Sequence, residues 1–368
     1  MRIREVIDFM ESWAPPGAAL AKDHPGLQVG DPAVEVKNIL VCLEVTDRII
    51  EEAVENEVNL ILSHHPLIFQ PLRNIDSATW LGRKISRLLQ AGITVYSAHT
   101  NLDAAREGVS IALAKRLGVE RPKFLVPAEG RWLKKIAVFV PPDHLDAVRI
   151  AMADAGAGVI GAYSQCSFNI EGFGTFFGGS DAAPAVGEKG NLERVKEVRL
   201  EMILPAWRSR KVIAAMRNSH PYEEVAFDLY PLENEDVNYG FGAIGDLPQP
   251  VSLQNLLQSI RERLGIKAVG VVEGPSEKIS RLAVCGGSGG ELAEAAWRQG
   301  ADVFITGEMK YHTLLEYEDR MILIIAGHYP TEAVILPVWA DRLQRWLGDA
   351  PISVIETKLI TNPVKYLT

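Results

Sequence analysis

A short apolar run that ends in two histidines is the feature that most restricts how this chain can fold. Residues 58–62 are followed at once by Ser63-His64-His65-Pro66. Five mostly apolar residues before a proline predict a buried strand with an abrupt end. In an open α/β sheet, ligand-binding side chains gather where such strands end. An isolated His-His pair is more often one core and one surface histidine, so its meaning depends on the rest of the chain.

Predicted strands and helices alternate around this pair and again near the end of the chain. Apolar runs expected to form strands cover residues 38–43, 58–62, 93–96, 281–285, 301–306 and 321–326. Segments between them show the apolar spacing of helices. Strands that alternate with helices predict parallel α/β sheets.

The first and last parts of the chain also match each other position by position. Val41-Cys42 corresponds to Val284-Cys285. The distance in sequence from Val41-Cys42 to His64-His65 equals the distance from Val284-Cys285 to Gly307-Glu308. We interpret this match as an internal duplication that produces two similar α/β half-domains. The alternative is that any two βαβ units look alike.

The middle of the chain has a different pattern. Strands and helices are expected in the order βαββαβ, over residues 134–140, 143–155, 164–170, 197–204, 208–217 and 225–230, with a glycine-rich hairpin region over 172–187. This is the order of a ferredoxin-like domain. We therefore expect an α/β metal-binding core made of residues 1–130 and 236–368, with an inserted ferredoxin-like domain over 131–235.

Three strand ends carry side chains that suit a divalent transition metal. They are His64 with His65, His99 with Asp103, and His328 with Glu332. Imidazole and carboxylate ligands fit Zn, Fe, Mn or Ni, and the lack of cysteine in these loops disfavours a thiolate zinc site. Each residue alone has an ordinary structural explanation, but agreement among three strand ends favours a metal site. With five or six candidate ligands, two ions bridged by a carboxylate are favoured over one.

Three further motifs have both a structural and a functional interpretation. Glycine-rich residues 285–290 are interpreted as a tight turn, with an anion cradle as the alternative. Glu308 and His312 are candidates for outer-shell partners or proton carriers, or are simply polar residues at the mouth of the sheet. His220-Pro221-Tyr222-Glu223-Glu224 is interpreted as a helix-ending turn, with ligand or metal binding as the alternative.

Composition restricts the partners and the compartment. The 368 residues carry a net charge of −9, which argues against nucleic acid because phosphate binding needs a local excess of Lys and Arg. Three cysteines, Cys42, Cys166 and Cys285, fit a reducing compartment better than a disulfide framework. No apolar run has the length of a membrane span, and the charged N-terminal residues do not resemble a signal peptide. We therefore expect a cytoplasmic protein without a membrane partner.

Taken together, four motifs resemble the NIF-three-like proteins, also called the type 2 GTP cyclohydrolase I family. They are Ser63-His64-His65-Pro66, His99-Thr100-Asn101-Leu102-Asp103, Thr306-Gly307-Glu308 with His312, and Gly327-His328-Tyr329-Pro330-Thr331-Glu332. The resemblance covers about residues 1–125 and 236–368. The middle segment is similar to the PII- and CutA-like insertion of longer members.

This resemblance implies a dinuclear metal site between two similar α/β halves. The implied ligands of the two divalent ions are His64, His65, Asp103, His328 and Glu332. Among these Glu332 would bridge the ions, and His99 would lie close by. The resemblance also implies a toroidal homohexamer built as a trimer of dimers. The GTP cyclohydrolase label belongs to the family, whereas the sequence itself shows no guanine pocket.

Three positions depart from the family pattern. The Trp-Asp-Asn-x-Gly loop of the family is Asp23-His24-Pro25-Gly26 here, its Asp-Val-Thr is Glu44-Val45-Thr46, and its serine before the last glutamate is Thr331. No implied ligand is lost, so the implied metal site is unaffected. The changed loops bear instead on which substrate the pocket accepts.

The leading hypothesis is a metal-dependent hydrolase that acts on a small molecule such as a nucleotide or a cyclic amide. Beyond the near-site candidates His99, Glu308 and His312, no catalytic residue is assigned. The alternative is a regulatory or partner-binding protein whose metals are structural or sensed and whose inserted domain recognises a small ligand. A ring that clamps nucleic acid is disfavoured by the acidic balance of the chain.

Overall fold

The structure, a computed structural model, describes residues 1–128 and 133–365. It contains two compact units, Met1–Val126 with Tyr239–Thr368 and Pro127–Asn238. We call them the core unit and the middle unit and describe each by itself. The expected boundary at residues 130 and 131 lies outside the described residues. The second division follows Asn238, where the sequence suggested residue 235.

The N-terminal half of the core unit is built on a sheet with the order β1-β4-β3-β2-β15. Its strands are β1 (Gly26–Val29), β2 (Ile39–Cys42), β3 (Leu60–Ser63), β4 (Thr94–Ser97) and β15 (Val354–Glu356). β15, β2, β3 and β4 run parallel, and β1 pairs antiparallel with β4. β2, β3 and β4 are buried along their whole length, as expected for parallel strands covered on both faces.

The C-terminal half contains a second sheet with the order β11-β14-β13-β12-β10-β5. Its strands are β5 (Glu120–Ala128), β10 (Asp236–Val251), β11 (Gly270–Val272), β12 (Ile279–Ser288), β13 (Val303–Glu308) and β14 (Ile322–Ile325). β12, β13 and β14 run parallel, and β11 pairs antiparallel with β14. The order β11-β14-β13-β12 therefore repeats the order β1-β4-β3-β2 of the first sheet.

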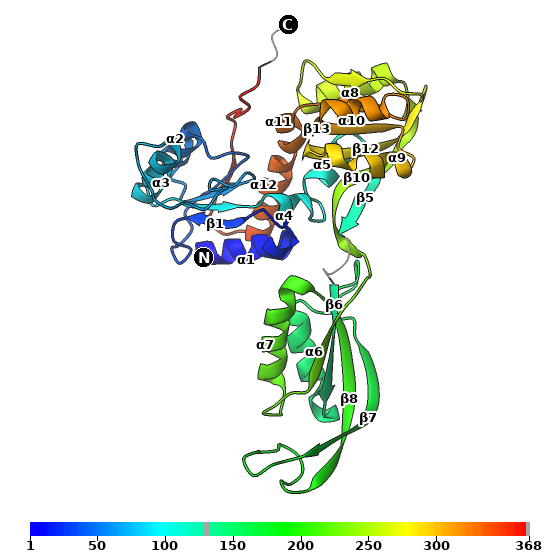
Figure 1. The fold of residues 1–368 in the computed structure, drawn as a ribbon. Helices are drawn as coiled ribbons and strands as arrows, with labels where there is room; N and C mark the ends of the chain where they lie inside the picture. Colours follow the sequence, from blue (N-terminus) through cyan, green and yellow to red (C-terminus); the bar gives the residue numbers. More distant parts are fainter. Residues whose placement is uncertain (129–132, 366–368) are drawn as a thin grey trace. The chain divides into compact units, whose positions relative to one another are not determined.

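Helices cover both faces of the N-terminal sheet (Figure 1). The helices of the core unit are α1 (Ile3–Trp13), α2 (Asp47–Glu55), α3 (Trp80–Gln90), α4 (Thr100–Asp103), α5 (Val109–Arg116), α8 (Leu253–Leu264), α9 (Ala293–Arg298), α10 (Tyr311–Tyr317), α11 (His328–Glu332) and α12 (Ile335–Leu347). α2 and α3 pack against Leu40 and Ile61. α1 and α12 pack on the other face, against Val41 and Leu62. Neighbouring strand residues point to opposite faces, which explains this division.

The end of the chain returns to the N-terminal half. Trp339 on α12 is fully buried, and its indole Nε1 lies 3.1 Å from Met10 Sδ on α1. Burying one such large apolar side chain contributes about 1.5–3 kcal/mol to stability. Because α11 immediately precedes α12, this packing fixes α11 beside the end of β3.

The middle unit has an antiparallel sheet with the order β7-β8-β6-β9. Its strands are β6 (Leu133–Val140), β7 (Phe168–Phe177), β8 (Leu192–Pro205) and β9 (Phe227–Pro231), and its helices are α6 (Leu145–Asp154) and α7 (Ser209–Ser219). Both helices pack on one face of the sheet, over Val138 and Leu200.

The predicted mixed α/β class is confirmed. The glycine-rich hairpin region expected over 172–187 lies in the antiparallel β7–β8 hairpin, where residues 172–177 extend strand β7. Glycine in a strand indicates a close approach by another group, and at Gly174 this group is the carboxylate of Glu197. The three cysteines are free. Among the described residues, no helix is long and apolar enough to cross a membrane.

Candidate metal centre

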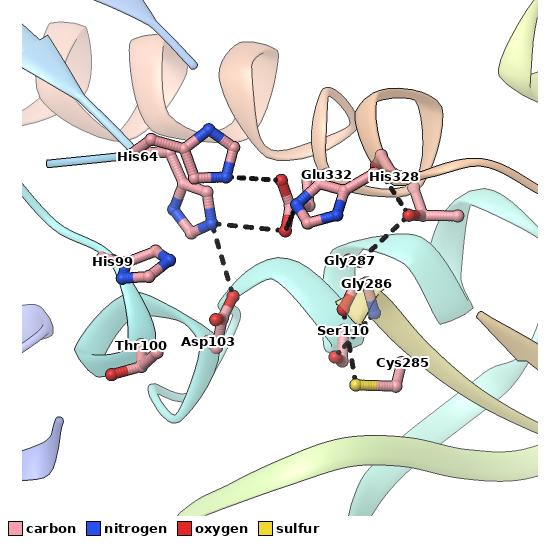
Figure 2. A network of polar contacts seen from close by, with 12 residues as sticks. His64, His99, Thr100, Asp103, Ser110, Cys285, Gly286, Gly287, His328 and Glu332 are labelled. Carbon is pink, nitrogen blue, oxygen red and sulfur yellow. Dashed lines mark hydrogen bonds and ion pairs between the residues drawn. The ribbon is translucent and has the colours of Figure 1, made fainter. Parts of the chain in front are cut away.

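Polar side chains from three strand ends of the core unit meet at one place (Figure 2). His64 and His65 follow β3, Asp103 ends α4 after β4, and His328 and Glu332 lie on α11 after β14. Gly327, with φ of 88°, turns the chain from β14 into α11. Such a positive φ favours glycine. The cluster therefore combines the carboxyl ends of β3 and β4 in the N-terminal sheet with that of β14 in the second sheet.

Glu332 lies at the centre of the cluster, and its side chain is only 5% exposed. Its Oε1 lies 3.1 Å from His328 Nε2 and 3.8 Å from His64 Nε2. Its Oε2 lies 3.0 Å from His65 Nε2. Figure 2 shows the carboxylate between the imidazoles of His64 and His328. A carboxylate whose two oxygens face different imidazoles is placed to bridge two cations.

The three histidines around Glu332 share one orientation. Their Nδ1 atoms lie 2.9 Å from the Ala98 carbonyl oxygen for His64, 3.2 Å from Glu44 Oε1 for His65, and 3.1 Å from Glu308 Oε1 for His328. When Nδ1–H donates to these oxygens, the Nε2 lone pair is directed at Glu332. Metal-binding histidines are held in this way by an outer hydrogen-bond partner.

His64 shows most clearly that a cation fits here. Its side chain is fully buried, and no residue that the structure describes forms a hydrogen bond with Nε2. This atom lies 3.7 Å from Asp103 Oδ1 and 3.8 Å from Glu332 Oε1, too far for hydrogen bonds. Two ligand atoms on one tetrahedral zinc, each about 2 Å from the ion, lie roughly 3.3 Å apart. The spacing therefore fits shared coordination, which would satisfy a buried atom that otherwise lacks a partner.

The pKa shifts of the acidic and histidine side chains also indicate that a cation fits this cluster. Burial alone would raise the pKa of Glu332, but contacts with three histidines hold it well below its usual value. Burial alone would lower the pKa of His65, but Glu332 and Glu44 raise it to about 10. Burial raises the pKa of Asp103, although His64 opposes this effect. Protons and a divalent cation therefore compete for the same atoms.

His99 lies beside this cluster and contacts Asp23, which begins one of the loops that depart from the family pattern. Its ring centroid lies 5.3 Å from that of His64, and its Nδ1 lies 3.0 Å from Asp23 Oδ1. Thr100 donates to Asp23 Oδ2 from its backbone nitrogen at 3.0 Å and its hydroxyl at 2.5 Å. Burial alone would raise the pKa of Asp23, but the contacts with His99 and Thr100 hold it well below its usual value. An ionised Asp23 thus orients the imidazole of His99.

Of the other two near-site candidates, only Glu308 reaches the centre. It contacts His328 Nδ1 at the end of β13, which is the outer-shell role considered for it. His312 is exposed on α10 and is not among the residues that line the cavity beside the centre. The turn of α10 after β13 carries it away from the strand end.

The glycine-rich residues 285–290 have a packing role at the centre. They were expected to form a tight turn, but β12 continues through them to Ser288 with a break in register. Gly287 has φ of 65°, and a Cβ atom at this position would lie 2.1 Å from Glu332 Oε1. Only glycine leaves room for the carboxylate, so this position requires a residue without a side chain.

Two groups of side chains could hold a metal ion. They are His64 with His65 and His99, and His65 with His328 and Glu332. The ligand atoms within each group lie within 4.8 Å of one another. A cavity of about 530 Å³ opens beside them, lined also by Phe69 and Phe241. Nitrogen and carboxylate ligands next to a cavity of this size suit a catalytic rather than a closed structural site.

Sequence reasoning missed Asp23 and Glu44 as partners of the site. The available signal for Asp23 was the pairing of β1 with β4, in which Gly26 lies opposite Ser97, close to His99. Glu44 follows β2, which is the strand next to β3, so its side chain reaches His65. Both contacts depend on strand order, which local sequence patterns do not reveal.

Comparison with known proteins shows to which family the chain belongs. The family model described as Duf34/NIF3 (NGG1p interacting factor 3) matches residues 1–363. A Bacillus subtilis protein named GTP cyclohydrolase 1 type 2 homolog is 38% identical over 99% of this chain and 98% of its own length. A Mycobacterium tuberculosis protein with the same name is 36% identical over 99% of this chain and 96% of its own length.

Solved structures show the same similarity. A Bacillus cereus protein related to NIF3 is 38% identical, with a TM-score of 0.84 over 100% of this chain and 99% of that one. A Staphylococcus aureus protein is 29% identical, with a TM-score of 0.77 over the same shares of the two chains. From the family match and the full-length relatives, the chain belongs to the Duf34/NIF3 family.

Proposed function

We propose that this protein is a divalent-metal-dependent hydrolase with two metal ions in the core unit. The observation that carries the proposal is the common orientation of His64, His65 and His328, which all direct Nε2 at Glu332. Their Nδ1 atoms are occupied by outer oxygen acceptors. Zn, Fe, Mn and Ni all accept this ligand set.

The distances divide the five proposed ligands into two groups that share Glu332. His64 faces Asp103 and Glu332 Oε1 at 3.7 and 3.8 Å. His65 and His328 face Glu332 at 3.0 and 3.1 Å. One ion would be held by the first group and the other by the second. A bound pair of such ions supplies Lewis acidity and a water with a lowered pKa.

In this proposal the pair of Asp23 and His99 moves the proton. Asp23 contacts Nδ1 of His99 at 3.0 Å, so the Nε2 atom of His99 is free to accept and return a proton within the cavity. A positioned imidazole of this kind contributes typically about 10²–10⁴-fold to a hydrolytic rate. His99 also belongs to one of the two groups that could hold a metal ion. Measuring metal content in a His99 variant separates these two roles.

The cavity lining favours an uncharged substrate with a flat apolar part. Leu20, Phe69, Phe241 and Leu292 contribute apolar surface, whereas no lysine or arginine is among the lining residues. GTP, the compound in the relatives' names, carries a triphosphate, for which the two proposed metal ions would be the positive partners, without a lysine or arginine of the described lining to add to them. We therefore favour hydrolysis of a cyclic amide over hydrolysis of a nucleotide.

The test is a hydrolysis screen on full-length protein reconstituted with Zn, Mn, Fe or Ni. Hydantoin and dihydrouracil serve as cyclic amides, with GTP and p-nitrophenyl phosphate as anionic comparisons. We expect a cyclic amide to be hydrolysed, with at least about a 100-fold loss in His65→Ala. Two bound metals without activity on any compound would refute the hydrolase and favour the regulatory alternative. Absence of metal binding would refute the site itself.

Three finer features complete the proposal. The repeated strand order of the two sheets supports an internal duplication of the core unit. The order β7-β8-β6-β9, with α6 and α7 on one face, supports a ferredoxin-like insertion related to PII and CutA. We also propose a cytoplasmic homohexamer, for which light scattering should give about six times the chain mass of 40.4 kDa. A monomer or dimer mass would contradict the hexamer.

A further inference from the structure

The middle unit contains a cavity on the face of its sheet opposite α6 and α7. Val138 on β6 belongs to the apolar cluster under these helices, so its neighbour Phe139 faces the other way. Phe139 lines the cavity together with Phe176, Glu197, Tyr222 and the loop between β7 and β8. The volume of about 490 Å³ lies in the range of small-molecule sites.

Hydrogen bonds fix the walls of this cavity. The backbone nitrogen of Ala183 in the loop donates to Glu223 Oε1 at 2.8 Å. His220 Nε2 donates to the Phe139 carbonyl oxygen at 3.0 Å, and its Nδ1 accepts from the Tyr222 backbone nitrogen at 3.1 Å. His220 is therefore a neutral residue that shapes the turn expected from the sequence. The same turn places Tyr222 and Glu223 in the lining.

The carboxylate of Glu197 lies against the cavity wall. A Cβ atom at Gly174 would be 2.1 Å from Glu197 Oε2, so the glycine makes room for this carboxylate. Tyr222 lines the same cavity as Glu197, and burial together with Glu197 raises the pKa of its phenol to about 12. A negative charge and an aromatic ring thus lie side by side in the same cavity.

Negative charge predominates in the lining of this cavity. Among the described lining residues there is no lysine, arginine or histidine, whereas Glu197, Glu223 and Glu224 are present. The cations nearest to Glu197 along β8 have other partners. Lys196 lies 3.0 Å from Glu171, and Arg199 lies 2.9 Å from Glu201 and 5.8 Å from the centroid of the Phe139 ring. Within residues 133–238, no lysine or arginine forms an ion pair with Glu197. A partly buried carboxylate without a counter-charge is unfavourable until a cation binds.

We propose that this cavity binds a small organic cation, namely a protonated amine joined to an aromatic or other apolar body. The ammonium group meets the Glu197 carboxylate and the ring faces of Phe176 and Tyr222, which attract cations. The apolar body packs against Ala182, Pro184 and Val186 of the loop. Phosphates and carboxylates find no positive group in this lining. The site belongs to the middle unit and does not depend on the proposed hydrolase activity.

Calorimetry on the full-length protein tests this proposal with three probes of one shape. They are 2-phenylethylamine, which is protonated at neutral pH, 2-phenylethanol, which is neutral, and 3-phenylpropionate, which is anionic. We expect the amine to bind at least about tenfold tighter than the other two. In Glu197→Gln, amine affinity falls about tenfold. The matched control Glu171→Gln changes the net charge equally at a residue outside the cavity, and it keeps wild-type affinity.

A second variant covers the case in which Glu197→Gln fails to fold. Phe176→Leu keeps an apolar side chain but removes a ring face, so it should weaken the amine about threefold and leave the alcohol unchanged. Chelator-treated protein should bind the amine as well as untreated protein, because the metal centre is a different site. Equal binding of amine and alcohol to the wild type would overturn the proposal. So would wild-type amine affinity in a folded Glu197→Gln variant.

Discussion

Gly287 lies so close to Glu332 that a single methyl group there should weaken metal binding strongly. A Cβ atom at Gly287 would lie 2.1 Å from Glu332 Oε1 and 3.4 Å from His328 Nε2. Real Cβ contacts essentially never fall below 3.0 Å, so in Gly287→Ala the carboxylate must move by at least about 0.9 Å. Metal–oxygen bonds of about 2.0–2.2 Å tolerate about ±0.2 Å. The required shift therefore exceeds the tolerance several-fold.

The consequence for metal binding follows from the position of Glu332. Disturbing an outer partner of a ligand costs about 10–100-fold in metal affinity, and displacing a ligand shared by two ions should cost at least as much. We expect Gly287→Ala to retain fewer than two ions per chain after gel filtration, measured by mass spectrometry of the metal. Added metal should also raise its melting temperature less than that of the wild type, because ligand binding stabilises in proportion to affinity.

Gly265→Ala provides a matched control for backbone strain. Gly265 ends α8 with φ of 66°, almost the value of 65° at Gly287, but nothing lies within 4 Å of its added Cβ. Both variants therefore bear the left-handed backbone penalty of about 1–2 kcal/mol, and only Gly287→Ala also has the clash. Full metal content in Gly287→Ala would refute the steric argument. Equal loss of metal in both variants would show that backbone strain, and not the clash with Glu332, causes the loss.

Three other predictions concern the ligands and their neighbours. Glu332→Gln keeps the shape but removes the charge shared by both groups of ligands, so metal content should fall to at most one ion per chain. In metal-free protein, Glu332 and Glu44 overcome burial and raise the pKa of His65 to about 10, above its unfolded value of about 6.5. This stabilisation is complete below pH 6.5 and is lost as the pH rises to about 10. The melting temperature should therefore fall across that window, and less so in His65→Ala. Asp23→Asn removes the charge that orients His99, so hydrolysis should slow about tenfold or more at unchanged metal content; unchanged turnover would exclude the proton-carrier role.

Part of the candidate metal centre was predictable because parallel strands of one sheet share an edge. Apolar runs located β3 and β4, which are neighbours in the N-terminal sheet, so His64 and Asp103 were expected to lie close together. Glu332 follows β14, which belongs to the second sheet. Its place beside His64 depends on how the two halves of the core unit pack, and the sequence indicated it only through the agreement in residue type among three strand ends.

Features that depend on contacts between distant segments were not predictable. β15 is only three residues long, and it joins β2 because α12 packs on α1. Asp23 reaches His99 only through the pairing of β1 with β4. Gly287 looked like part of a turn, whereas its role is to leave space for Glu332. An absent side chain has no chemical signature in a sequence.

The two halves of the core unit supply different ligands because their strand ends have different amounts of room. In the duplicated pattern, Gly307 stands where the first half has His64. A Cβ atom at Gly307 would lie 2.5 Å from the Gly287 carbonyl oxygen and 2.8 Å from His328 Cα. Any side chain there would displace α11, which carries both His328 and Glu332.

Glu308, the counterpart of His65, also has a changed role. Its carboxylate contacts His328 Nδ1 and therefore orients a proposed ligand instead of supplying one. If the ends of β3 and β13 both carried a histidine pair, the four imidazoles would occupy the space of the central carboxylate. When protonated, these imidazolium groups would also repel one another. If the two sheets arose by duplication, as we propose, one copy can contribute to the proposed shared metal centre only by giving up its histidine pair. The space beside Gly307 is occupied by α11, which carries Glu332.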